Sequence, residues 1–185
     1  MSTPHGAVAA TATFRKATWS ETAVLLAFAW CVPFFVHLVP WSGARPLGAY
    51  LGPMFWVTFI AAYFFGTRIA IVVGLFSPAI NLIVTGLPAW KFLANISGEL
   101  VLFALLAAWA VRWRPAFLLT APLACLAAKV IAAPIQDFLT DSGPIGQSLY
   151  LSVIGGVAGL VVLAGINVTL VWFYPKAGAA PASRE

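Results

Sequence analysis

Six apolar stretches, separated by short polar turns, constrain this chain more than any motif does. They cover approximately residues 19–39, 49–65, 69–84, 92–111, 116–133 and 148–174. A helix needs about 20 predominantly apolar residues to cross the hydrocarbon core of a bilayer. The composition agrees, because 62% of the residues are hydrophobic and only 8% are charged. The sequence therefore predicts an all-α membrane protein, a compact bundle of six transmembrane helices.

Basic residues fall mostly on one side of this predicted bundle. Six spans place both termini on the same side, which carries Arg15, Lys16, Arg68, Arg112, Arg114, Lys176 and Arg184, whereas the other side carries Arg45 and Lys91. Lys and Arg are enriched in cytoplasmic segments of membrane proteins. We therefore expect both termini to be cytoplasmic, in a multi-pass protein of the bacterial inner membrane. Residues 1–17 and 176–185 are then cytoplasmic tails, and residues 18–175 form the transmembrane domain. We expect no removable signal peptide, because the first apolar stretch is long enough to span.

The stretch from Ser77 to Pro88 combines helix-breaking residues with a polar side chain. Pro78 lacks a backbone N–H, and Gly86 and Pro88 favour a turn. Asn81 places an amide about one turn after Pro78. Within lipid, backbone groups released by Pro or Gly must be satisfied by protein or by a water-lined cavity. The stretch predicts either a helix that opens into a pocket or a bent helix end followed by a turn.

The polar residues inside the apolar stretches gather in the outer half of the predicted bundle. Ionisable groups within a membrane are costly and usually functional. Antiparallel neighbouring spans bring Glu99 and Lys129 to similar depth, and Asn95 shares a helix face with Glu99. This asymmetry favours a pocket that opens outward over a path across the membrane. The polar residues are His37, Asn81, Asn95, Glu99 and Lys129, and Trp41, Trp90 and Phe138 in outer loops are candidate walls or lids.

Structural roles are the alternative for each of these residues. Glu99 and Lys129 can pair and hold two helices together, or Lys129 can extend to the outer headgroups. Asn81 can cap backbone released by Pro78, and His37 can be an interfacial residue. Cys31 and Cys125 lie in apolar segments and are expected to be small buried side chains.

Catalytic signatures are missing from the sequence. It contains no HExxH, GxSxG, Walker A or GxGxxG pattern. Its two histidines, one of them in the N-terminal tail, do not form a paired haem ligand set, and the cysteines lack metal-ligand spacing. We therefore expect a protein that is not an enzyme and that carries no cofactor or metal.

These features resemble the substrate-binding S components of energy-coupling factor (ECF) vitamin transporters. The chain has 185 residues and the six short spans, cytoplasmic termini and outer polar cluster expected of that family. Residues 77–81 and 85–88 look like the end of the third helix and the following loop in some members. Ala23 and Ala27 are similar to the Ala-xxx-Ala motif on the first helix, which docks the transmembrane coupling subunit.

The resemblance implies a transport function. An S component captures a vitamin or related small molecule from outside, closes loops over it, and joins a coupling subunit and two ATPases that supply ATP hydrolysis. The ligand-binding residues implied here are Asn81, Trp90, Asn95, Glu99, Lys129 and Asp137. The alternative is a small structural or assembly subunit of a larger membrane complex, which would pack through the Ala and Gly faces of its helices.

Overall fold

Every regular element in the described part of the chain, residues 18–43, 47–86, 89–140 and 145–176, is an α-helix. The computed structural model places helices at α1 (Trp19–Leu38), α2 (Leu47–Leu51), α3 (Pro53–Phe65), α4 (Thr67–Thr85), α5 (Trp90–Trp113), α6 (Thr120–Thr140), α7 (Ile145–Gly155) and α8 (Val157–Phe173). Apart from Lys176, which is buried, the expected tails 1–17 and 176–185 lie outside the described residues. So do the side chains of Trp30, His37, Lys91, Asp137, Phe138, Leu139, Thr140, Ile145 and Ser148.

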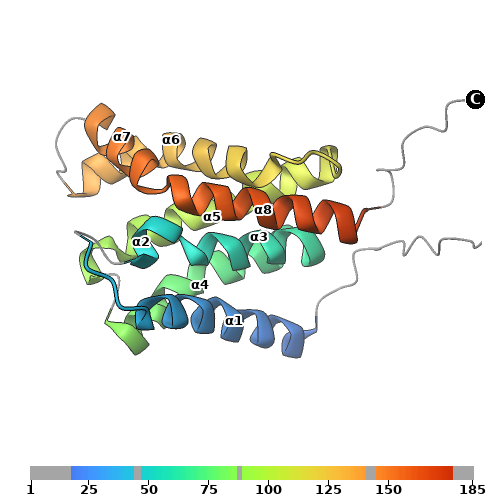
Figure 1. Ribbon diagram of the computed structural model, residues 1–185, viewed down its shortest axis with the longest axis horizontal. Helices are drawn as coiled ribbons and strands as arrows, with labels where there is room; N and C mark the ends of the chain where they lie inside the picture. The colour runs from blue at the N-terminus through green and yellow to red at the C-terminus, as the bar shows by residue number, and fades with distance from the viewer. Residues whose placement is uncertain (1–17, 44–46, 87–88, 141–144, 177–185) are drawn as a thin grey trace, which may run out of the picture.

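The helices lie side by side in one elongated bundle (Figure 1). The start of α1, at Trp19, and the end of α8, at Phe173, lie at the same end of the bundle, which we call the terminal end. The opposite end, where α1 ends and α2 begins, is the distal end. An even number of passes is compatible with this arrangement, and the number of spans and their orientation in a membrane stay predictions.

Three helical segments in the described part are long and apolar enough to cross a membrane, Trp19–Val36, Thr67–Thr85 and Phe92–Trp113. The bent pair of α7 and α8 makes a fourth if it is counted as one span. The apolar segments Pro53–Phe65 and Thr120–Gln136 are shorter. These lengths are those of a membrane protein with three to four candidate spans, and the crossing of all six stretches stays a prediction.

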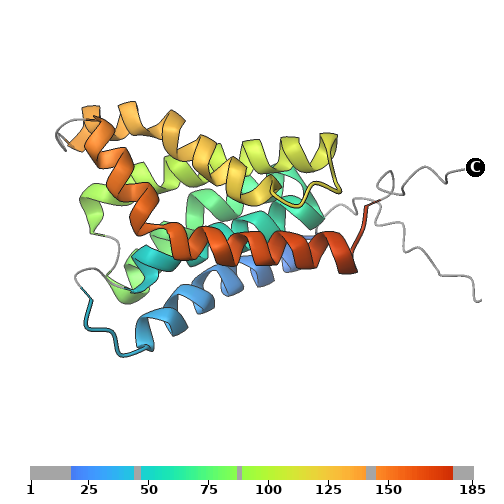
Figure 2. The ribbon, with the colours of Figure 1, turned by 45° about the horizontal axis from the view of Figure 1, so that its top comes forward.

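Two of the six predicted spans are each broken at a glycine. Gly52 adopts the left-handed conformation, with φ of 57°, and Pro53 then begins α3. Proline is well suited to the first turn of a helix, and glycine to left-handed backbone. Gly156 separates α7 from α8, whose axes differ by 58° (Figure 2). The prediction of one continuous helix over 49–65 and another over 148–174 is therefore wrong.

The predicted opening of the helix at Pro78 is also wrong. Helix α4 continues through Pro78 to Thr85, and Gly86 ends it in the left-handed conformation with its N–H bonded to the carbonyl of Leu82. The hydroxyl of Ser97 on α5 donates to the carbonyl of Leu75, 3.2 Å away and one turn before Pro78. Pro78 removes the donor for the carbonyl of Gly74, so the bond from Ser97 lies beside the weakened position and does not replace the missing one. Residues 87–88 lie outside the described part.

Helix α6 is longer at its distal end than predicted. It begins at Thr120 rather than at residue 116 and runs through Pro134 to Thr140, where the sequence indicated a loop. Proline inside a membrane helix is tolerated when neighbouring protein satisfies the freed backbone.

The turn before α6 is held by a separate contact. The side-chain amide of Asn167 on α8 donates to the carbonyl of Phe117 at 3.1 Å. This bond ties α8 to the turn before α6 and stabilises that turn.

The core consists mainly of alanine and aromatic side chains on α3, α5 and α6. Phe103 packs edge-on against Phe55, with ring centroids 5.2 Å apart, and lies 6.5 Å from the ring of Phe59. The fully buried alanines of the core include Ala61, Ala70, Ala104, Ala107, Ala121 and Ala128. Small side chains let helices approach closely, which is how membrane helices gain packing energy.

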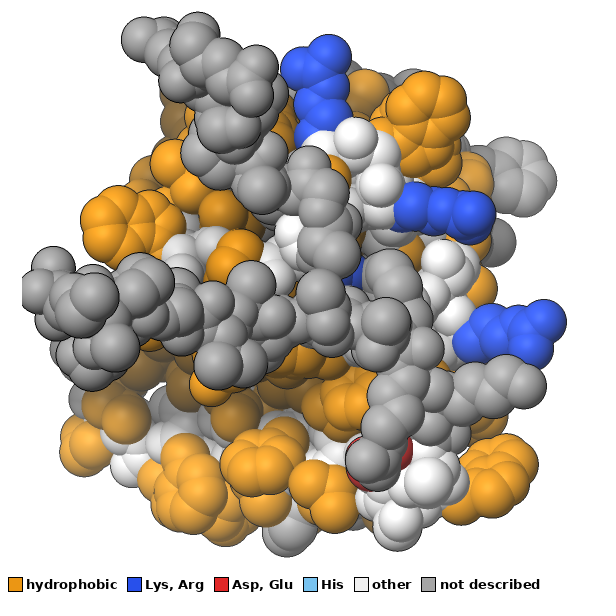
Figure 3. Space-filling view, turned by 90° about the vertical axis from the view of Figure 1, so that its right-hand side faces the viewer, with side chains coloured by type: hydrophobic (Ala, Val, Ile, Leu, Met, Phe, Trp, Pro, Cys, Tyr) orange, Lys and Arg blue, Asp and Glu red, His pale blue; other side chains and the backbone are white. Residues whose placement is uncertain are grey.

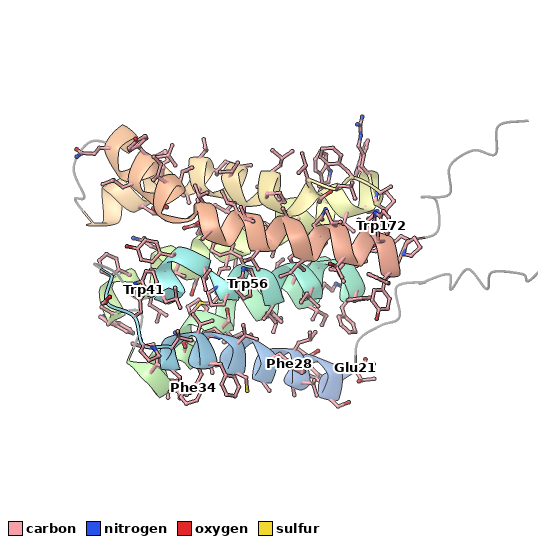
Figure 4. The ribbon with its side chains drawn as sticks, viewed as in Figure 1. Glu21, Phe28, Phe34, Trp41, Trp56 and Trp172 are labelled. Carbon is pink, nitrogen blue, oxygen red and sulfur yellow. The ribbon has the colours of Figure 1, made fainter. Side chains whose placement is uncertain are left out.

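Basic side chains are exposed near the terminal end, as Figure 3 shows. They include Arg68, Arg112 and Arg114. Trp172 lies at the same end and Trp41 at the distal end (Figure 4), and both are exposed. Exposed tryptophans at the two ends are typical of membrane interfaces. Arg15, Lys16, Arg45 and Arg184, which also enter the charge comparison, lie outside the described residues.

The chain just after α8 is anchored to α3 at the terminal end. The hydroxyl of Tyr63 lies 2.8 Å from the carbonyl of Tyr174 and 3.2 Å from that of Leu170. The ammonium of Lys176 is buried and lies 4.8 Å from the centre of the Tyr63 ring. Burial lowers the pKa of Lys176 to about 8, because the charged form loses hydration.

Candidate functional site

A buried ion pair joins α5 to α6 in the distal half of the bundle. Lys129 Nζ lies 2.8 Å from Glu99 Oε1, and the two side chains are only 14% and 8% exposed. Glu99 is the tenth residue of α5, which places it about 14 Å along the helix from Trp90. The predicted pairing of the two residues is therefore present in the structure.

Neutral donors and acceptors complete this pair. Gln136 Nε2 donates to the second carboxylate oxygen of Glu99 at 3.1 Å. Lys129 Nζ also donates to Ser152 Oγ on α7 at 3.1 Å and lies 5.5 Å from the centre of the Phe55 ring. Each of the two charges thus has an opposite charge and a further polar partner, as buried charges require. We call Glu99, Lys129, Gln136 and Ser152 the charge cluster.

The larger of two cavities beside the cluster is mostly apolar. It encloses about 440 Å³ between α1, α2, α3, α4, α5 and α6. Glu99, Lys129 and Asn81 are its polar wall residues, and Asn81 is almost fully buried. Its apolar walls include Pro33, Pro53, Met54, Phe55, Phe92 and Ile96. An apolar cavity with a few placed polar groups has the general character of a small-molecule site.

The smaller cavity lies where the two broken helices meet. It encloses about 330 Å³, and Lys129, Ser152, Tyr50 and Cys125 supply its polar and polarisable side chains. The two breaks contribute glycine backbone, from Gly52, Gly155, Gly156 and Gly159. Helix α8 passes so close to α2 that a Cβ atom on Gly159 would overlap the carbonyl oxygen of Leu51. Glycine is therefore required at this crossing.

The two cavities are neighbours. Ala49, Gly52, Phe55 and Lys129 line both of them. Lys129 thus reaches the larger cavity together with Glu99 and the smaller one together with Ser152. Among the described residues that line either cavity, Glu99 and Lys129 are the two that carry charge.

The structure brings only some of the predicted site residues together. Asn81, Glu99 and Lys129 share the larger cavity. Trp90 is 79% exposed at the start of α5 and lines neither cavity. Asn95 also lines neither, although its Oδ1 is buried and has no hydrogen-bond partner among the described residues. The side chain of Asp137 lies outside the described residues.

Other predicted features are placed as follows. Ala23 and Ala27 are exposed on α1. Trp41 packs edge-on against Tyr50, with ring centroids 5.8 Å apart, and so lies next to a wall of the smaller cavity. Cys31 and Cys125 are both free, and Cys125 is buried. The expected buried, unpaired state of the cysteines holds for Cys125, whereas Cys31 is half-buried.

Sequence reasoning missed Gln136, Ser152 and Phe55. The sequence predicts a loop over 134–147, which includes Gln136, because Pro134 is typical of a helix end. The Gly52-Pro53 and Gly155-Gly156 pairs were the available signals for the breaks that bring α2, α3, α7 and α8 around the smaller cavity. Ser152 lies on another helix, 23 residues along the chain from Lys129, and no local pattern pairs them.

Comparison with known proteins identifies no family for the chain. Neither the protein-family models, the curated proteins nor the solved structures compared with the chain give a match.

Proposed function

We propose that the protein is a membrane-embedded subunit that binds a vitamin or a related small molecule, as the S component of an ECF-type transporter does. The observation that carries the proposal is the Glu99–Lys129 pair inside a mostly apolar bundle: both residues line the larger cavity, and Lys129 also lines the smaller one. A pair used only to hold helices together gains nothing from adjacent open space. Cavities beside placed polar groups are what a ligand needs.

The position of the cavities supports uptake from outside. Arg68, Arg112 and Arg114 mark the terminal end as the cytoplasmic one by the positive-inside rule. The larger cavity reaches Ala89 and Phe92, near the start of α5 at the distal end. On this orientation the ligand enters from the side opposite the arginines. The inner membrane of a bacterium is the proposed location.

The exposed face of α1 is the proposed contact with a partner. Ala23 and Ala27 are exposed, and small residues permit close approach of another helix. In this proposal a transmembrane coupling subunit docks there, and two ATPases supply the ATP hydrolysis for which the chain has no motif.

An assembly subunit is the second candidate, and one observation favours it. Both carboxylate oxygens of Glu99 already accept hydrogen bonds, from Lys129 and Gln136. A satisfied cluster of this kind can act as a purely structural link between α5 and α6. Such a protein would use the same exposed α1 face for assembly but would retain no small molecule.

Native mass spectrometry and thermal-shift screening against vitamins and their precursors separate the two candidates. A ligand at 100 times its Kd stabilises a protein by about 2.7 kcal/mol. We expect a retained mass or a shift in the wild type, its loss in the neutral double variant Glu99→Gln/Lys129→Met, and no loss in Thr169→Ala, which changes an exposed residue of α8. The assembly subunit would be favoured if no mass is retained, no shift appears across the panel, and a large partner co-purifies that is bound at the exposed face of α1.

A further inference from the structure

We propose that the ligand of the paired cavities is electrically neutral, with an apolar body and a hydrogen-bond acceptor that binds Lys129. This inference rests on the proposed ligand-binding function and names the chemical class. It starts from the charges of the cavity walls. Glu99 carries the negative charge and Lys129 the positive one, and their atoms are 2.8 Å apart.

The negative charge of Glu99 requires no cationic ligand. One carboxylate oxygen accepts from Lys129 and the other from Gln136. A cationic ligand would have to displace Lys129 or leave an extra positive charge beside it. Uncompensated charge is strongly disfavoured in an apolar interior within a membrane. The same argument applies to an anion, because Lys129 is already neutralised by Glu99.

The positive partner still has a hydrogen bond to offer. An ammonium has three N–H donors, and Lys129 uses one on Glu99 and one on Ser152. The third can meet a carbonyl, ether or ring-nitrogen acceptor of a ligand. Because Lys129 lines both cavities, an acceptor in either cavity can reach it.

The cavity walls determine where the rest of the ligand lies. Met54, Phe55, Phe92 and Ile96 give the larger cavity an apolar surface suited to a ring or short chain. The smaller cavity holds Ser152 and the glycine backbone of both helix breaks, which suit a polar end. The ligand class is therefore a neutral amphipathic molecule, such as an uncharged heterocycle.

A thiol placed in the smaller cavity tests this inference without knowledge of the ligand. Ser152→Cys, in a background with Cys31→Ala and Cys125→Ala, puts a reporter beside Lys129. In detergent, it is treated with three methanethiosulfonates that carry a neutral hydroxyethyl, a cationic trimethylammonium-ethyl or an anionic sulfonatoethyl group. Each rate is divided by the rate of the same reagent with 2-mercaptoethanol. Ratios between reagents within one variant cancel changes in thiolate fraction.

With the pair intact, we expect the neutral reagent to react about tenfold or more faster than either charged one, because charge is excluded from the site. Adding Lys129→Met should raise the relative rate of the cationic reagent, and adding Glu99→Gln should raise that of the anionic one. The double change Glu99→Gln/Lys129→Met should restore the faster reaction of the neutral reagent. It also serves as the control in case the single variants misfold.

Two other results are distinguishable. A charged reagent that equals the neutral one while the pair is intact would overturn the neutral ligand class and leave the open cavity, and hence the proposed function, in place. Failure of all three reagents until the protein is unfolded would show that no accessible cavity exists, which overturns both proposals.

Discussion

The distal and terminal halves of the bundle are built from the same apolar composition but in opposite ways. In the distal half, glycines interrupt helices at Gly52 and Gly156, and a charge cluster lies between two cavities. In the terminal half, alanines such as Ala107 and Ala121 are fully buried and Tyr63 anchors the end of α8. Both halves contain hollows, but those of the terminal half, between α1 and α3 and beside α5 and α6, are lined mostly by apolar side chains. The helix breaks of the distal half therefore distinguish it by bringing a charge cluster to its cavities.

The largest expected effect comes from removing one charge of the pair. Glu99→Gln leaves Lys129 buried without a counter-charge, and breaking a buried pair in this way typically costs about 3–5 kcal/mol. We expect a matching fall in unfolding free energy during denaturant titration in detergent.

The control is the double variant Glu99→Gln/Lys129→Met, which removes both charges and should regain most of the lost stability. Equal stability of the single and double variants would mean that the pair contributes little to the distal half.

A smaller effect is expected at the crossing of α8 and α2. Gly159→Ala places a methyl group against the carbonyl of Leu51, and overpacking of this kind costs about 1–3 kcal/mol. We expect a lower midpoint of thermal unfolding. Gly165→Ala, on the same helix, meets nothing within 4 Å and should leave the midpoint unchanged or raise it. If both variants behave alike, α8 is not in close contact with α2.

The terminal half is probed by Tyr63→Phe. This change removes a hydroxyl within hydrogen-bond distance of the carbonyls of Leu170 and Tyr174, and a typical hydrogen bond contributes about 1 kcal/mol. We expect a modest loss of stability, with faster amide hydrogen exchange confined to the end of α8. Exchange that rises equally around the distal cavities would contradict the separation of the two halves.

A pH dependence of stability is expected from Lys176. Its pKa is about 8 in the folded protein, below the ordinary value of 10.5. Between these values the unfolded state binds more protons, so stability should rise as the pH increases from about 8 to about 10.5. Lys176→Met should abolish this rise in thermal melts recorded across that range. A rise of the same size in the variant would assign it to another group.

Much of this arrangement was predictable because it depends on local sequence. The helical stretches and the pairing of Glu99 with Lys129 follow from apolar length and from the cost of buried charge. Gln136 and Ser152 were not predictable, since Pro134 reads locally as a helix end and Ser152 is an ordinary polar residue in an apolar stretch. Their roles depend on how far α6 continues and on where α7 turns.

The sequence by itself determined that this chain forms apolar helices, and it predicted that Arg68, Arg112 and Arg114 share one end while Asn81 and Glu99 lie toward the other. These are properties of hydrophobicity and charge, which each segment carries wherever it packs. Only the tertiary structure decided that the helices break at Gly52 and Gly156 rather than at Pro78. The reason is that proline and glycine weaken a helix only locally, and whether the helix then breaks depends on how its neighbours pack against it.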